Sequence, residues 1–299
     1  MDLENLSRRW LASVLCGIGF LAIAEVAQCL PLAPRWQATF PALANGQARD
    51  STAVAVTGES MMVVVVAAGS DPTSLKLQLG DRSIPFKVVG HDPVSRLGFI
   101  NIVGNVIPSP AAWVEDASAS ASTTLQFMEP GGPAQCRTTG WVKQVAGKIL
   151  PLALLRVNFS RDVPPPGTPL TDSLGRIVGI VFQNSGTANV GYAIPAEAVG
   201  RVQQDICNGG QLVRGWLGLA LLAESPTPAI CRVLPNSPAA AAGIRPNDLL
   251  LNIGTRPVAD YADAANAFFY LIPGQPVQVK LKRDSSQLEF TLTPTLPKG

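Results

Sequence analysis

Short runs of β-branched and apolar residues recur through the middle of the chain, separated by turn signals. Between residues 51 and 192 these runs predict strands at 53–57, 62–66, 75–79, 84–89, 97–103, 177–182 and 189–193. Gly58 and Gly80 mark two of the intervening turns. Short strands at regular spacing are typical of a barrel or a sandwich. We therefore predict that this part of the chain is all-β.

The pattern changes near residue 195, where apolar side chains recur at helical spacing: Ala198, Val199, Val202 and Ile206. This spacing predicts a helix over 195–207, which the glycines at 209 and 210 would end. A second compact unit follows from about 214 to 294. Its pattern predicts strands at 230–234, 249–253, 277–281 and 288–292, and helices at 238–242 and 262–271.

The most apolar part of the chain is the segment 10–30, which begins at Trp10, ends at Leu30 and follows two arginines. Its uncharged stretch, 11–24, has 14 residues, a length typical of a signal peptide, and a small-x-small cleavage signal ends at Ala24. The whole segment has 21 residues, about one membrane span, so an uncleaved signal anchor is the other interpretation. Both interpretations export the rest of the chain, because the arginines favour a cytoplasmic N-terminus.

Three prolines, Pro31, Pro34 and Pro41, interrupt the next segment, which has no clear periodicity. We therefore expect a linker at 31–50. The expected organisation is a signal peptide or signal anchor at 1–30, this linker, a β domain at 51–208 and a second domain at 209–295.

Composition excludes several classes of protein. The chain has 299 residues, enough for about two domains, and with 47% hydrophobic and 15% charged residues it is not a disordered chain. Its net charge of +2 provides no electrostatic footprint for nucleic acid. His91 is the only histidine, and the five cysteines lack metal-type or redox-type spacing. We therefore expect no metal site and no cofactor.

Three motifs resemble the HtrA/Deg-like trypsin-fold serine proteases, which carry a C-terminal PDZ domain. GYAIP at 191–195, a helix and VRGWLG at 213–218 resemble the junction between the two domains of that family. SPAAAAGIRPND at 237–248 resembles a PDZ signature, and PPPGTPL at 164–170 resembles the segment around the nucleophile. The resemblance covers residues 50–295 and implies a mainly β chain: a trypsin-like double β-barrel, then a PDZ domain, with an N-terminal apolar helix.

The resemblance also assigns the catalytic positions, and this chain departs from the family at each of them. It puts Ala67 at the histidine position, Arg96 at the aspartate position and Pro166 at the serine position. Pro164 and Pro166 occupy the two oxyanion-hole positions, and proline has no backbone N–H to donate. We therefore expect a degenerate protease, or pseudoprotease, with no catalytic residues.

The sequence offers few side chains that could act as a substitute catalyst. We expect His91 to lie in a surface loop near Ser95, with no oxyanion hole beside them. We expect Cys136 on a loop, and Cys207 and Cys231 as buried apolar filler in a helix and a strand.

The second unit keeps the form of a PDZ domain, which binds an extended peptide by adding it to a sheet edge. The peptide-binding residues implied by the resemblance are Trp216, Leu217, Gly218 and Leu219, in the loop that would hold a terminal carboxylate. The opposite wall is the helix 262–271, where Phe268 or Phe269 faces the groove or else belongs to the core.

The sequence therefore predicts a non-catalytic, exported or membrane-anchored scaffold on the periplasmic side of the cytoplasmic membrane. It would bind a protein C-terminus or extended peptide, as an accessory subunit of a membrane complex under one interpretation. The alternatives are a functioning endopeptidase, for which Ser173 is the nearest serine in the nucleophile segment but in the wrong frame, and a periplasmic quality-control chaperone. Related proteases form trimers through the segment before the barrel, so a homo-oligomer also stays open.

Overall fold

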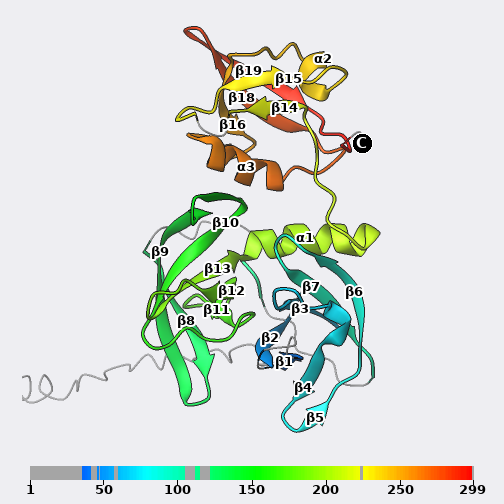
Figure 1. Cartoon of the computed structure of the whole chain (residues 1–299), viewed down its shortest axis with the longest axis vertical. Helices are drawn as coiled ribbons and strands as arrows, with labels where there is room; N and C mark the ends of the chain where they lie inside the picture. The colour runs from blue at the N-terminus through cyan, green and yellow to red at the C-terminus, as the bar shows by residue number, and fades with distance from the viewer. Residues whose placement is uncertain are drawn as a thin grey trace, which may run out of the picture. The chain divides into compact units, whose positions relative to one another are not determined.

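The computed structural model describes residues 36–41, 46, 48–56, 60–104, 112–114, 122–222 and 225–297. The predicted signal peptide or anchor at 10–30 lies outside these residues. Within the described part of the chain, no helix combines the length and apolar character needed to cross a membrane. Strands are the main secondary structure of the described residues, which form two β units bridged by one long helix and followed by a smaller C-terminal unit (Figure 1).

The first β unit is a seven-stranded antiparallel sheet in the order β5-β4-β1-β2-β3-β7-β6. Its strands are β1 (Trp36–Phe40), β2 (Arg49–Ala55), β3 (Met61–Val65), β4 (Lys76–Leu79), β5 (Arg82–Ser83), β6 (Phe86–Asp92) and β7 (Leu97–Ile102). A short 3-10 helix, η1 (Pro72–Ser74), precedes β4. The sequence analysis predicted most of these strands to within a few residues.

The predicted linker at 31–50 is wrong in part, because β1 lies inside it. This strand pairs with both β2 and β4, so it is an integral part of the sheet. Trp36, Ala38 and Phe40 alternate into the core and are at most 2% exposed. The strand is only five residues long, with three inward-facing side chains, and prolines flank it, so the sequence pattern did not reveal it.

The second β unit is a closed barrel in the order β10-β13-β12-β11-β8-β9. Its strands are β8 (Thr124–Glu129), β9 (Gly132–Val145), β10 (Lys148–Phe159), β11 (Pro169–Thr171), β12 (Ile177–Asn184) and β13 (Val190–Pro195). The sequence analysis missed the long β9–β10 hairpin. The side chains that β9 turns inward include Ala134, Cys136 and Thr138, which are small, and Thr138 is also polar, so they give no clear alternating signal.

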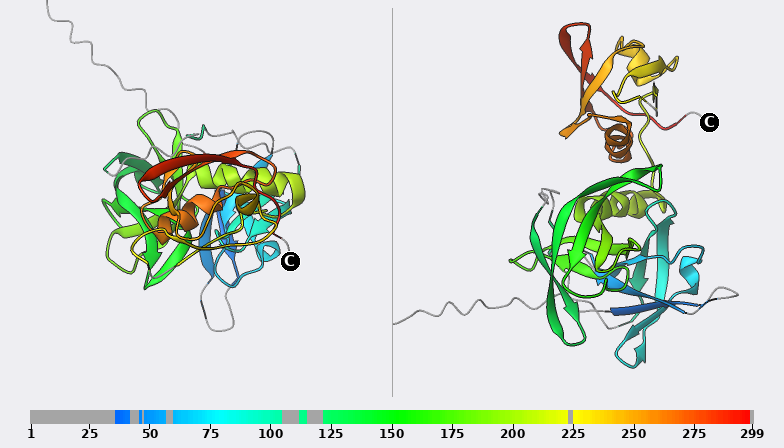
Figure 2. Two further views of the ribbon diagram at one scale, coloured as in Figure 1. Left: turned by 90° about the horizontal axis from the view of Figure 1, so that it is seen from above. Right: turned by 60° about the vertical axis from the view of Figure 1, so that its left-hand side comes forward.

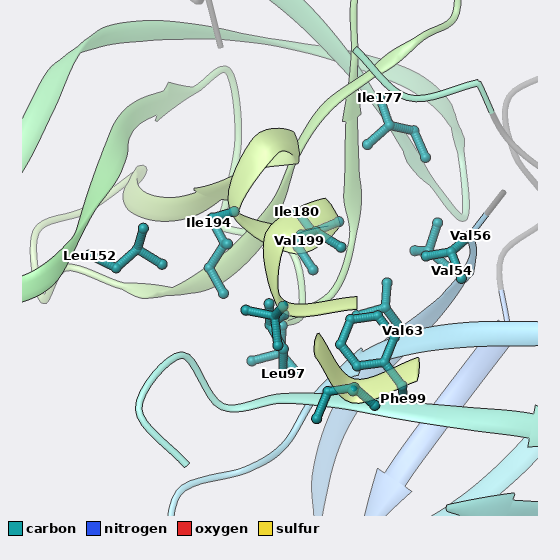
Figure 3. Close-up of a cluster of buried hydrophobic side chains, with 14 of the residues drawn as sticks. Val54, Val56, Val63, Leu97, Phe99, Leu152, Ile177, Ile180, Ile194 and Val199 are labelled. Atoms are coloured by element: carbon teal, nitrogen blue, oxygen red, sulfur yellow. The ribbon is translucent and has the colours of Figure 1, made fainter. Parts of the chain in front are cut away.

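The helix α1 (Ala196–Gly209) lies across both β units and covers the core between them (Figures 1 and 2). Val199 of α1 packs with Val63 and Phe99 of the first unit and Ile180 of the second (Figure 3). The helix ends at Gly210, which has φ +73 and donates its N–H to the carbonyl of Ile206 at 2.8 Å. This shared core fixes the facing edges of the two units against each other.

The C-terminal unit contains two sheets and two helices around its own core. Its elements are β14 (Leu219–Leu221), β15 (Ile230–Val233), α2 (Pro238–Ala241), β16 (Leu249–Ile253), β17 (Arg256–Pro257), α3 (Tyr261–Phe269), β18 (Val277–Arg283) and β19 (Ser286–Leu292). One sheet pairs β14 with β15, and the other has the order β17-β16-β18-β19. Asn247 has φ +72, a conformation that asparagine tolerates better than most residues.

Candidate functional site

The three positions that the resemblance assigned to a catalytic triad come together in one pocket. Ala67, Arg96 and Pro166 all line a cavity of about 330 Å³. The other lining residues are Arg49, Asp50, Ser51, Val65 and Ala68. The pocket lies at the junction of the two β units, since Pro166 belongs to the second unit and the other lining residues belong to the first.

Backbone hydrogen bonds hold Ala67 and Arg96 beside each other. Arg96 precedes β7, and its carbonyl accepts a hydrogen bond from the N–H of Val66 at 2.7 Å. Arg96 also has φ +58, a left-handed conformation that is uncommon for a residue with a Cβ. The turn before β7 thereby places the Arg96 side chain next to the end of β3.

The proline run is clamped onto β2. The carbonyl of Pro166 accepts hydrogen bonds from the N–H of Thr52 at 2.7 Å and from the hydroxyl of Ser51 at 3.0 Å. The next residue, Gly167, has φ +82 and donates its N–H to Val181 at 2.7 Å. A Cβ at position 167 would lie 2.0 Å from the carbonyl oxygen of Thr52, so only glycine fits.

The pocket is cationic. The Arg96 guanidinium stacks 4.2 Å from the ring centroid of Phe182 and donates to the Phe182 carbonyl at 3.3 Å. Burial lowers the pKa of Arg96, and the charge of Arg49 acts in the same direction. Arg49 itself donates to the Ala68 carbonyl at 2.6 Å and to the Ser70 hydroxyl at 2.8 Å.

Ser51 is the only residue lining this pocket that has a hydroxyl, and none of its described lining residues has an imidazole or a thiol. The Ser51 hydroxyl is buried and shares its proton between the carbonyls of Val65, at 3.1 Å, and Pro166. The sequence analysis missed both Ser51 and Arg49, although each stands on β2 where it meets the proline loop. No motif marks either residue, because their role depends on contact across the two β units.

His91 does not lie in a surface loop as expected, but in β6, where it is half-buried. Its Nε2 has no hydrogen-bond partner among the described residues. Burial lowers the pKa of this imidazole, against the opposing pull of Asp92 and Asp71. The nearby Ser95 hydroxyl donates to Asp92 at 2.6 Å rather than to His91.

The cysteine expectations are wrong in three places. Cys136 lies in β9 rather than on a loop, and burial raises the pKa of its thiol to about 12, so it stays protonated at neutral pH. Cys207 and Cys231 are exposed rather than buried. Ser173 is exposed in the turn between β11 and β12.

A second pocket, of about 250 Å³, collects the predicted peptide-binding residues of the C-terminal unit. Trp216, Leu217, Gly218, Leu219 and Phe268 all line it. Phe269 lines it as well and is 1% exposed, so one face of α3 serves both the pocket and the core.

The loop before β14 has the geometry of a carboxylate cradle. Gly218 has φ +80, and a Cβ there would lie 2.1 Å from the Cβ of Ser237. The carbonyls of Leu217 and Gly218 accept hydrogen bonds from Ala239, at 3.1 Å, and Leu234, at 2.8 Å. No described backbone carbonyl accepts from the N–H groups of Leu217 and Gly218. These two N–H groups are thus available to an anionic chain end.

Comparison with known proteins identifies the C-terminal unit and the fold. Residues 215–293 match the PDZ domain family. A probable periplasmic serine endoprotease DegP-like from Ectopseudomonas mendocina (strain ymp) is 28% identical over 250 residues, which are 76% of this chain and 52% of that protein. A protein of the same description from Chlamydia trachomatis is 25% identical over 229 residues, 70% of this chain and 46% of that protein. The chain spans about half the length of these relatives.

Comparison with solved structures indicates the same fold. The HtrA-type protease AlgW with a tripeptide has a TM-score of 0.64 at 21% identity, over 90% of this chain and 95% of that one. A serine endoprotease from Yersinia pestis has a TM-score of 0.55 at 18% identity, over 89% and 96%. The prediction of a mainly β chain with an HtrA-like trypsin fold and a PDZ domain is therefore confirmed. The expected first barrel is, in the described residues, the seven-stranded sheet rather than a closed barrel.

Proposed function

We propose that this chain is a non-catalytic, exported HtrA-like protein that binds a protein partner or peptide tail through its PDZ domain. The observation that carries the proposal is the single pocket lined by Ala67, Arg96 and Pro166. Their proximity supports the alignment of these residues with the three triad positions. None of the three side chains can act as nucleophile, general base or orienting carboxylate in the way acyl transfer requires.

The backbone supports the same conclusion. Pro164 and Pro166 stand at the two oxyanion-hole positions and have no N–H. Losing one such donor typically costs about 2.7–4 kcal/mol of transition-state stabilisation. The N–H of Gly167 is already donated to the carbonyl of Val181 in β12, so it does not replace them.

Under this proposal the PDZ domain carries the function, which is to bind a peptide. Its cradle loop, its groove wall at Phe268 and the edge strand β14 supply what strand addition of an extended peptide needs. We expect a C-terminal peptide with an apolar last side chain, because Trp216, Leu217, Leu219 and Phe268 form the walls of the pocket.

Two observations support a periplasmic location for the folded part of the chain. The DegP-like relatives are described as periplasmic, and the segment 10–30 has the character of an export signal. We propose that the folded part lies on the periplasmic side, either tethered through residues 10–30 or released after cleavage. A tethered chain would suit an accessory subunit of a membrane complex.

The alternative is a functioning serine endopeptidase, which is favoured by the description of the relatives as serine endoproteases. A quality-control chaperone that binds exported proteins without cutting them shares the fold and differs only in partner selectivity.

A serine-directed fluorophosphonate probe and a casein-cleavage assay separate the first two functions. We expect no labelling and no cleavage by the full-length chain, with an active DegP-like protease as the positive control. A labelled serine located by peptide mapping would overturn the non-catalytic proposal. Purification from membranes in mild detergent would then separate scaffold from chaperone, since a scaffold brings a fixed, stoichiometric partner and a chaperone brings a changing set of exported proteins.

A further inference from the structure

We propose that the pocket lined by Arg49, Arg96 and Ala67 binds a carboxylate carried by a polypeptide, and so has become an anion-binding site. The inference goes beyond the proposed peptide binding by the PDZ domain, because it concerns a different pocket on a different domain. It rests on three features of the pocket: two guanidinium groups, the lack of a described ion pair for either of them, and the apolar residues that line the pocket.

The first step is the unbalanced positive charge. Arg49 and Arg96 both line the pocket, yet neither forms an ion pair with any described carboxylate. Arg96 is partly buried, and its Nε is buried without a partner among the described residues. A cation withdrawn from water is costly unless an anion or hydrogen-bond acceptors compensate it.

The second step is the unused donor capacity. A guanidinium has five N–H donors. Arg49 uses one hydrogen bond from each terminal nitrogen, to Ala68 and Ser70, and Arg96 uses one, to Phe182. Stacking on Phe182 and the hydrogen bond to its carbonyl hold Arg96 in place, and the hydrogen bonds to Ala68 and Ser70 in the turn after β3 hold Arg49. Groups that are already held in place lose less entropy when a ligand binds.

The third step selects the anion. Asp50 also lines the pocket, and among the described residues its carboxylate accepts one hydrogen bond, from the Thr39 hydroxyl at 3.4 Å. Two arginines and one aspartate leave a net charge of about +1, which suits a monoanion better than a doubly charged phosphate. The apolar walls at Val65, Ala68 and Pro166 suit a carboxylate attached to an apolar chain, and planar carboxylates match the guanidinium fork.

Methyl NMR of the full-length chain with labelled alanines tests the proposal at residue level. Ala67 and Ala68 report on this pocket, and Ala265 lines the PDZ pocket. The probes are an N-acetylated tripeptide with a free C-terminus, the same tripeptide as its C-terminal amide, the amide form carrying one internal aspartate, and inorganic phosphate.

We expect saturable shifts of the Ala67 and Ala68 signals with the carboxylate-bearing peptides and none with the uncharged amide. The free-terminus and internal-aspartate arms show which source of carboxylate the site prefers. Arg96→Gln and, independently, Arg49→Gln should each weaken this binding about tenfold or more. The matched control Arg176→Gln, on an exposed arginine paired with Asp172, should leave it unchanged.

Absence of saturable shifts, an affinity in both pocket variants equal to that of the unaltered chain, or tighter binding of phosphate than of the peptides would overturn the proposal. A shift confined to Ala265 would also overturn it while supporting the PDZ function. Conversely, a silent Ala265 with shifted Ala67 would count against the PDZ function alone. Using two arginine variants guards against one that fails to fold.

Discussion

The hydroxyl of Ser51 donates to the carbonyl of Pro166 at 3.0 Å, which joins two segments 115 residues apart in the chain. The same proton is shared with the carbonyl of Val65 at 3.1 Å. One small side chain therefore connects β2, β3 and the proline loop, and it does so beside the pocket of Ala67 and Arg96. We therefore assign Ser51 a role in stabilising the fold around the pocket and no role in catalysis.

Ser51→Ala should therefore destabilise the full chain by about 1–2 kcal/mol, because it leaves a buried carbonyl without one of its donors. Urea denaturation followed by far-UV circular dichroism measures the change in the free energy of unfolding. Ser173→Ala, on an exposed turn, is the matched control and should change it by less than about 0.5 kcal/mol. Equal effects of the two variants would contradict the proposed clamp.

Gly218→Ala should abolish peptide binding by the PDZ domain, because the new Cβ would meet Ser237 at 2.1 Å in the cradle loop. Gly274→Ala is the control: Gly274 has φ +81, close to the φ +80 of Gly218, but no atom lies within 4 Å of its Cβ position. In both variants an alanine must adopt a positive φ, which costs about 1–2 kcal/mol. Only in Gly218→Ala does the new Cβ also clash with Ser237. Titration calorimetry with a C-terminal peptide distinguishes them, and a similar loss in both would refute the assignment of the cradle.

His91 should titrate below the ordinary histidine range, because burial outweighs the pull of Asp92 and Asp71 and lowers its pKa. The unfolded chain therefore binds the proton more readily, at a pKa of about 6.5. Neutral His91 makes its full contribution to the free energy of unfolding above about pH 6.5. This contribution is lost as the pH falls from there toward the pKa of His91 in the folded chain. As the only histidine, His91 gives a single imidazole signal in an NMR pH titration, and a midpoint above 6.5 would disprove the prediction.

Asp248→Asn should destabilise the PDZ domain by about 2–4 kcal/mol, because Asp248 is 1% exposed and accepts hydrogen bonds from Arg283 at 2.7 and 2.8 Å. These bonds lower the pKa of Asp248. Its contribution is therefore present above the unfolded carboxyl pKa of about 3.9 and is lost as pH falls through the lower folded value.

Glu289→Gln is the matched control for Asp248→Asn, since it removes an exposed ion pair with Lys280 at 3.7 Å in the same sheet. We expect it to change the stability by less than about 1 kcal/mol. Thermal unfolding of both variants at neutral and acidic pH measures the two effects. If Asp248→Asn lowers the stability as little as Glu289→Gln does, Asp248 does not stabilise this domain in the way we expect.

Strong periodicity made much of this fold predictable. The strand at 249–253 and the helix α1 were predicted nearly to the residue, because their apolar positions recur clearly and turn residues bound them. The strands β1 and β9 were not, because one is short and flanked by prolines and the other has small, polar inward side chains. Burial in those strands is decided by partners distant in sequence.

The candidate site shows the same division. The resemblance to the HtrA/Deg-like family assigned Ala67, Arg96 and Pro166 to the three triad positions, and the structure then places them around one cavity. The sequence did not identify Arg49, whose guanidinium reaches Ala68 and Ser70 in the turn after the neighbouring strand β3, or the half-buried environment of His91. Such residues carry no local signature, since their environment exists only once the sheet has formed.

The two prolines at 164 and 166 also bear on what a working catalytic site at this place would need. Ala67→His, Arg96→Asp and Pro164→Gly each need more than one base change in their codons. Because nucleophile, base and oxyanion donors act as a unit, no single reversal supplies a gain in catalysis on which selection could act. Under the proposed non-catalytic function, no single substitution in this pocket would therefore create a working Ser-His-Asp triad.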